Sequence, residues 1–136
     1  MSFRLRPHTA DVAVEATADA LGGVMAAAAD GMAAAMCEEP PVGGDRRPVE
    51  VRAESREALL FDYLDQLIYE RDVRSVLPVD NDATVSVDDG APRLEASYRG
   101  LPLAGLGARD LKAVTYSEME LAETDGGWRA YVVFDV

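Results

Sequence analysis

Two aspartates occupy comparable places near the two ends of this 136-residue chain. Asp11 opens an apolar run, and Asp135 closes another, one residue before the terminal carboxylate of Val136. If folding places these two runs side by side as strands, three groups that carry anionic oxygen converge. Hard divalent cations are the usual partners of such oxygens in proteins. The pattern therefore predicts an acidic pocket for calcium, magnesium or manganese, with Asp11, Asp135 and Val136 as its ligands.

Two other polar residues are candidates for contacting a partner. Lys112 is the only lysine of the chain and opens a strand-like run, from which its ammonium could engage a phosphate or an acidic group. His8 comes shortly before the apolar run that begins at Asp11.

Each of these residues also has a plain structural interpretation, which the sequence pattern leaves open. A lysine at a strand edge often protects that edge by staying solvated, and a histidine beside a loop often bonds to the local backbone. Asp11 is compatible with a turn cap, and Asp135 with a solvated strand end.

Several other site chemistries lack the residues that they need. The glycines between residues 100 and 107 do not have dinucleotide-binding spacing, and no Gly-Lys-Ser/Thr phosphate loop is present. The acidic residues at 80–82 and 88–90 lack the spacing and the closing glutamate of an EF-hand. One histidine and one cysteine cannot build a zinc site rich in imidazole or thiolate ligands.

The composition predicts one globular domain, residues 1–136, with enough chain to bury a core. Apolar residues make up 49% of it and charged residues 28%, as in ordinary globular domains. No run approaches the roughly 20 apolar residues of a membrane span, and no signal peptide opens the chain. We therefore expect a cytoplasmic protein with no membrane partner. The single cysteine, Cys37, excludes an internal disulfide and suits a small core or cap position.

The charge balance is strongly acidic, with 25 acidic against 13 basic residues and a net charge of -12. A surface this negative repels phosphate backbones, so we expect no direct binding of nucleic acid as the main activity. Two causes of the bias stay open. An acidic, lysine-poor surface suits a salt-rich cytoplasm, where ions screen the self-repulsion, and codon usage alone can also favour arginine over lysine.

The first part of the chain alternates strand-like and helix-like patterns. Residues 2–6 and 11–16 have the apolar spacing of short strands. Asp19 is the predicted N-cap of a helix, which carries an apolar stripe spaced by three and four residues. The stripe consists of Leu21, Val24, Met25, Ala28, Met32 and Met36. Residues 38–41 end this helix, and residues 43–45 form a turn.

A further strand is predicted around residues 49–53, and Ser55 is the predicted N-cap of a second helix. The buried face of that helix consists of Leu59, Leu60, Tyr63, Leu64, Leu67 and Ile68, with Asp62, Asp65, Glu70 and Arg71 outside the apolar stripe. The later predicted strands are 84–87 and 93–98, joined by a hairpin turn at 88–90, and then 111–116, 119–122 and 128–134. The order β-β-α-β-α followed by strands predicts an α+β fold, with two helices packed on a mainly antiparallel sheet.

Four segments, in the expected order along the chain, resemble the archease family. They are residues 8–12 (HTADV), 59–69 (LLFDYLDQLIY), 112–116 (KAVTY) and 128–136 (WRAYVVFDV). The first and third segments are the specific ones, because the second alone is a generic amphipathic stripe. The chain departs from the usual family residues at Tyr63, Gln66 and Ser117, where members often carry tryptophan, glutamate and histidine.

The resemblance implies an accessory protein of tRNA splicing and RNA repair, not a free-standing enzyme. Archeases assist the RtcB-type RNA ligase, which depends on GTP and metal, by promoting guanylylation of its active-site histidine and so permitting multiple turnover. By motif match, Asp11 and Asp135 correspond to the metal-binding aspartates of the family, with Val136 contributing oxygen. Lys112 matches the lysine that the family needs for activation. The family fold is an α+β sandwich with helices between sheet layers.

Two other functions remain compatible with the same residues. The carboxylates and Lys112 could serve an independent metal-dependent phosphohydrolase, in which a metal-bound water attacks a phosphate ester. Turnover of such esters by the protein alone would favour that function. The chain could also be a general chaperone or structural module in which the polar residues are caps and solvated edges. In that case, replacing Lys112 by alanine would change neither partner binding nor ligation.

Overall fold

The strands and helices follow one another in the order that the sequence pattern predicts. The computed structural model describes the backbone of residues 1–8 and 11–136, and the side chains of residues 1–6 and 11–136. The elements in this described part are β1 (Ser2–His8), β2 (Asp11–Ala18), α1 (Leu21–Met36), β3 (Asp45–Arg52), α2 (Arg56–Arg74), β4 (Val76–Asp88), β5 (Ala91–Pro102), β6 (Ala113–Thr124) and β7 (Gly127–Asp135).

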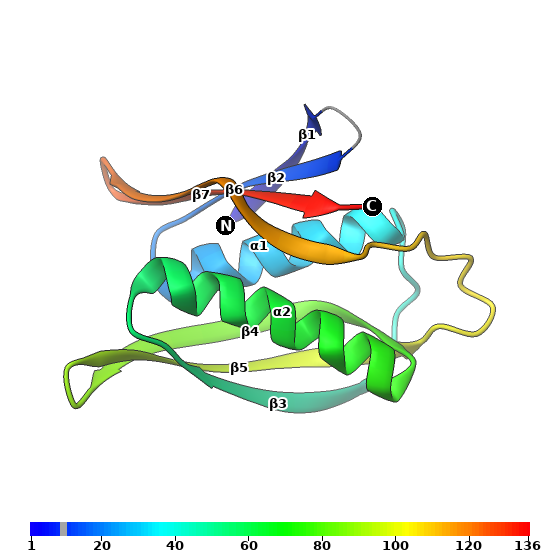
Figure 1. Ribbon diagram of the computed structural model, residues 1–136. Coiled ribbons are helices and arrows are strands. Elements are labelled where there is room, and N and C mark those ends of the chain that lie inside the picture. The colour runs from blue at the N-terminus through cyan, green and yellow to red at the C-terminus, as the bar shows by residue number, and fades with distance from the viewer. Residues whose placement is uncertain (9–10) are drawn as a thin grey trace.

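The strands form two antiparallel sheets, which lie on either side of the helices. One sheet has the strand order β1-β2-β7-β6, and the other has the order β3-β5-β4. Figure 1 shows both helices in the layer between the sheets. The predicted α+β class is therefore confirmed, with the strands divided between two sheets. The first and last strands of the chain, β1 and β7, both flank β2.

Small residues let α1 approach both sheets closely. Eleven of the 16 residues of this alanine-rich helix are buried, and none is exposed. A Cβ added at Gly22 would lie 2.4 Å from the carbonyl oxygen of Ala83 in β4, and one at Gly31 would lie 2.4 Å from Cγ1 of Val14 in β2. Glycine weakens helices by up to about 1 kcal/mol relative to alanine. Packing against two sheets therefore explains glycines that helix propensity would disfavour.

The ends of α1 agree with the predicted caps only in part. Asp19 is not the N-cap, because the helix begins at Leu21, one residue later than predicted. The N-cap is therefore Ala20, which forms no side-chain cap hydrogen bond. At the other end Cys37 is the C-cap, and its N–H donates to the carbonyl of Ala33 at 2.9 Å. Of the two positions expected for the cysteine, core or cap, the structure shows the cap.

The second helix confirms its predicted cap and its predicted apolar face, but two residues predicted to lie outside that face are buried as well. The Ser55 side chain accepts a hydrogen bond from the N–H of Ala58 at 3.1 Å, and all six residues of the predicted apolar face are buried. The prediction was wrong for Glu70 and Arg71, which are only 6% and 8% exposed. Glu70 accepts a hydrogen bond from the hydroxyl of Tyr98 in β5 at 2.7 Å, so its burial depends on a strand far along the chain.

The later strands are longer and fewer than predicted. The hairpin turn between β4 and β5 is confirmed, with positive φ at Asp89 and Gly90. The two strands predicted at 111–116 and 119–122 are one strand, β6, whose pairing with β7 shifts register between Thr115 and Glu120. The intervening residues are a bulge in the ladder, which in the sequence looks like a break between two strands.

Candidate functional site

Asp11 and Asp135 are direct partners in the ladder between β2 and β7. Residues directly opposite each other in antiparallel strands project from the same face of the sheet, with Cβ atoms about 4.5–5.5 Å apart. Val14 and Val132, on the alternate positions of the two strands, belong to the core. The two aspartates therefore lie on the face turned away from the helices. Figure 1 shows the C-terminus beside the start of β2.

The register extends this acidic pair into a row across all four strands. His8 of β1 pairs with Asp11, and Ala113 of β6 pairs with Asp135. The side chain of His8 lies outside the described residues, so only its place in the row is known. Asp11 is half-buried and Asp135 is exposed. Val136 follows directly and is 47% exposed. The structure thus brings together the four predicted residues of the two end segments.

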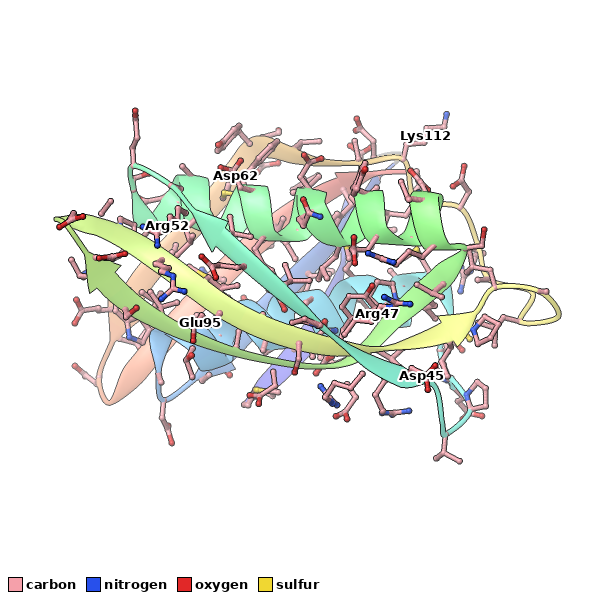
Figure 2. All side chains as sticks on the ribbon, turned by 90° about the horizontal axis from the view of Figure 1, so that it is seen from below. Asp45, Arg47, Arg52, Asp62, Glu95 and Lys112 are labelled. Atoms are coloured by element: carbon pink, nitrogen blue, oxygen red, sulfur yellow. The ribbon has the colours of Figure 1, made fainter. Side chains whose placement is uncertain are left out.

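Lys112 is tied to the acidic pair through its backbone. Its N–H donates to the carbonyl oxygen of Asp135 at 2.8 Å, one residue before β6 begins at Ala113. The side chain is exposed, and Figure 2 shows it extending away from the body of the molecule. Its ammonium forms no ion pair with a carboxylate in the described part of the chain. The lysine is therefore placed beside the pair with its charge available to a partner.

The sequence pattern missed a buried arginine that holds this segment from the other side. Arg71 of α2 donates through one terminal nitrogen to the carbonyl of Leu111 at 2.7 Å, and through Nε to Asp72 at 3.0 Å. The Leu111 side chain is itself only 1% exposed. The backbone on both sides of Lys112 is therefore anchored. Arg71 lies four residues after Leu67, on the apolar stripe, and this spacing was the available signal.

Farther along the same sheet face, two glutamates are paired with one arginine. Arg129 of β7 binds Glu15 of β2 at 2.6 Å and Glu120 of β6 at 3.1 Å. The hydrogen bond from Arg129 lowers the pKa of the Glu15 carboxyl below its ordinary value, although partial burial opposes the change. The Asp135 carboxylate has no such arginine among the described residues. Arg129 therefore neutralises acids in the middle of this face, whereas Asp135 at its end is exposed.

Two surface pockets flank the loop that leads to Lys112. One, of about 360 Å³, is lined by Asp11 together with Arg6, Glu38 and Arg109. The other, also of about 360 Å³, is lined by Arg71 and again by Arg109. Charged groups of both signs therefore line the hollow beside Asp11, and Arg109 contributes to both pockets.

The carboxylate oxygens of Asp11 and Asp135 suit a hard cation that takes only some of its ligands from the protein. Among the described residues, no group of three or more histidines, cysteines, aspartates or glutamates could hold a metal ion. Two opposed carboxylates, by contrast, resemble the way in which magnesium is held by one or two carboxylates plus phosphate oxygens from a substrate. The donors do not match the sulfur and imidazole ligands of structural zinc sites.

The family model described as the Archease protein family (MTH1598/TM1083) matches residues 3–136 of the chain. The chain belongs to the archease family. A protein archease of Methanosarcina mazei is 30% identical over 134 residues, which cover 95% of this chain and 92% of that protein. The protein archease of Archaeoglobus fulgidus is 28% identical over 137 residues and is matched along its whole length.

Solved structures agree with the archease assignment. The solution structure of Methanobacterium thermoautotrophicum protein 1598 is 31% identical, with a TM-score of 0.83 and 99% of each chain covered. The crystal structure of an archease from Thermotoga maritima, described as a possible chaperone, has a TM-score of 0.62 with 96% of each chain covered. At 19% identity the second supports the archease fold alone. Neither helix in the described residues has the length and apolar character needed to cross a membrane.

Proposed function

We propose that this archease is a non-catalytic activator of an RtcB-type RNA ligase, which depends on GTP and metal, in tRNA splicing and RNA repair. It promotes guanylylation of the ligase and so permits repeated turnover. The observation that supports this function is the position of Asp11 opposite Asp135, with the backbone of Lys112 hydrogen-bonded to Asp135. Family membership supports the same assignment.

Asp11 and Asp135, with an oxygen of Val136, are the residues that would hold a divalent cation such as calcium, magnesium or manganese. When bound, such a cation supplies charge neutralisation for a nucleotide triphosphate. The exposed ammonium of Lys112 contacts a phosphate or an acidic group of the ligase, as a flexible point charge can. His8 shares the row of the acidic pair and contributes to partner contact at that end.

The activator works in the cytoplasm through protein contact, not by binding RNA itself. Its net charge of -12 opposes contact with phosphate backbones. The acidic character instead favours association with a cationic protein surface, because complementary charge speeds encounter.

A reconstituted ligation assay with limiting ligase, GTP, metal and RNA tests this function. Without the protein, we expect each ligase molecule to complete about one ligation, and with the wild-type protein many. Lys112→Ala and Asp135→Asn should each abolish this gain while single-turnover ligation is unchanged. Asp125→Asn, an exposed carboxylate in the turn between β6 and β7, is the matched control. Full multiple turnover with both folded variants would reject the role. Hydrolysis of phosphate esters by the protein alone would favour a phosphohydrolase.

A further inference from the structure

One face of α2 carries exposed residues that its neighbours in the fold do not cover. Asp62, Asp65, Tyr69 and Val73 follow one another by three or four residues, so they lie along one side of the helix. Tyr69 is 57% and Val73 is 59% exposed, and both aspartates are exposed as well. Large apolar side chains left in solvent beside carboxylates are typical of contact surfaces.

The bulge in β6 extends this face with an aromatic pair. Tyr116 is the first residue of the bulge between Thr115 and Glu120, and its ring stacks on Phe61 of α2, with centroids 4.0 Å apart and planes at 4°. Tyr116 nevertheless remains 56% exposed. We call the combined area the α2–β6 surface. Its members are Phe61, Asp62, Asp65, Tyr69, Val73 and Tyr116.

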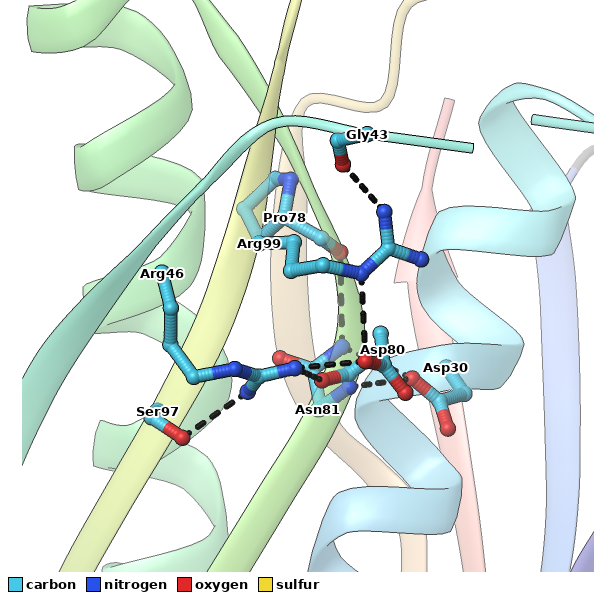
Figure 3. A network of polar contacts seen from close by, with 8 residues as sticks. All are labelled: Asp30, Gly43, Arg46, Pro78, Asp80, Asn81, Ser97 and Arg99. Atoms are coloured by element: carbon cyan, nitrogen blue, oxygen red, sulfur yellow. Dashed lines mark hydrogen bonds and ion pairs between the residues drawn. The ribbon is translucent and has the colours of Figure 1, made fainter. Parts of the chain in front are cut away.

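The carboxylates of the α2–β6 surface differ from those on the three-stranded sheet. Asp62 and Asp65 form no ion pair with any residue that the structure describes. Asp80 on the three-stranded sheet is instead paired with Arg46 and Arg99 (Figure 3). The acids of the α2–β6 surface therefore keep a negative field that is not compensated locally.

Negative charge beside exposed aromatic rings matches cationic groups, above all arginine. Carboxylates bind the guanidinium in plane, and the faces of tyrosine and phenylalanine attract it through the ring quadrupole. Aromatic residues are also enriched in protein interfaces. The same charge repels RNA phosphates, so the occupant that fits is a basic protein segment. A ligase that binds RNA must itself present such basic segments to hold phosphates.

We propose that the α2–β6 surface docks an arginine- and lysine-rich segment on the surface of the ligase. This inference rests on the proposed function, since it names the contact through which that activation is delivered. Figure 2 shows Asp62 and Lys112 along the same side of the molecule, with Asp45 on the opposite side. Docking on this surface therefore presents Lys112 to the partner.

A charge reversal, Asp62→Lys with Asp65→Lys, separates docking from activation. The ligase, GTP and metal are mixed without RNA, and the rate of ligase guanylylation is followed against the concentration of this protein. We expect the half-saturating concentration to rise on the order of tenfold, with the saturating rate retained. Asp45→Lys with Asp125→Lys changes net charge equally and is expected to leave both values unchanged. Both pairs are exposed, so each variant should keep the wild-type unfolding temperature.

The outcomes distinguish this inference from the function on which it rests. An unchanged half-saturating concentration in the reversed variant, or an equal rise in the control, would overturn the docking surface. A rise seen only when RNA is added would assign the surface to RNA. Titration of labelled ligase with this protein measures binding directly, and it covers the case in which guanylylation is not stimulated. If the wild-type protein binds but does not stimulate, and charge reversal weakens binding, the docking surface stands and activation fails. If the wild-type protein does not bind, both fail.

Discussion

Asp11 lies directly opposite Asp135 in the ladder between β2 and β7, on the sheet face that is turned away from the helices. Like charges directly opposite each other on one sheet face destabilise the pair of strands. Farther along the same face, Glu15 lies opposite Arg4 and Tyr131 and forms an ion pair with Arg129. A cation held between Asp11 and Asp135 would relieve this repulsion.

Replacing one member of the pair should stabilise the metal-free protein. We expect Asp135→Asn to raise the free energy of unfolding by about 0.2–1 kcal/mol in the presence of a chelator, because the asparagine removes the repulsion with Asp11. Urea denaturation measures the change. Asp125→Asn is the control and should leave stability unchanged. A variant less stable than the wild type would show that the Asp135 charge has a favourable partner.

Arg71→Met should loosen the segment that carries Lys112. The carbonyl of Leu111 would lose its donor while staying buried, which costs about 1–3 kcal/mol. Amide hydrogen exchange should become faster at residues 109–112 in particular. Arg52→Met is the control, because Arg52 forms only exposed ion pairs, which contribute little. Unchanged exchange at 109–112 would show that Arg71 does not anchor this loop.

Gly22→Ala should destabilise the fold despite the higher helix propensity of alanine. The added methyl would meet the backbone of β4 at Ala83, which cannot move aside as a flexible side chain could. Overpacking of this kind costs about 1–3 kcal/mol. At Gly23 an added Cβ meets only the methyl of Ala18, at 3.2 Å, so Gly23→Ala should cost less. Equal thermal unfolding midpoints for the two variants would contradict close packing of α1 on β4.

Local patterns predicted those features of the fold that depend on nearby residues. The cap at Ser55, the buried face of α2 and the turn at Asp89–Gly90 each depend on neighbours within a few positions, and each is confirmed. Asp19 shows the limit of the same approach, because a good capping residue stands one position before the actual N-cap, Ala20. Propensity does not fix the first residue of a helix to that precision.

The missed features depend on partners that are distant in sequence. Arg71 was predicted to lie outside the apolar stripe of its helix, yet it is buried because the carbonyl of Leu111, 40 residues later, accepts its hydrogen bond. Glu70 is buried for the same reason, through Tyr98. The division into two sheets also depends on long-range pairing. At the candidate site, the residue types pointed to Asp11 and Asp135, but only the register of β2 and β7 places them opposite each other.

Asp30 should make stability depend on pH in a defined direction. Burial raises the pKa of its carboxyl, although the backbone and side-chain N–H groups of Asn81 donate to it at 2.9 Å (Figure 3). A raised folded-state pKa favours the protonated form in the native protein. The associated stability is full below the unfolded-state value of about 3.9 and is lost as pH rises through the folded-state value.

Asp30→Asn keeps an acceptor for Asn81 and removes the charge, so it should stabilise the protein most above the folded-state pKa of Asp30. Urea denaturation of both proteins between pH 4 and pH 7.5 gives the difference in unfolding free energy, in which the groups common to both largely cancel. We expect the advantage of the variant to grow with pH. An advantage that is constant, or that grows on acidification, would contradict the assigned burial.

A manganese titration of the isolated protein decides whether Asp11 and Asp135 share one cation. The wild-type chain is expected to bind one manganese ion, and Asp11→Asn with Asp135→Asn to lose that binding while the fold is retained. Asp62→Asn with Asp65→Asn removes the same charge from α2 and should bind as the wild type does. Equal manganese binding by the wild type and the Asp11/Asp135 double variant would contradict a shared metal site.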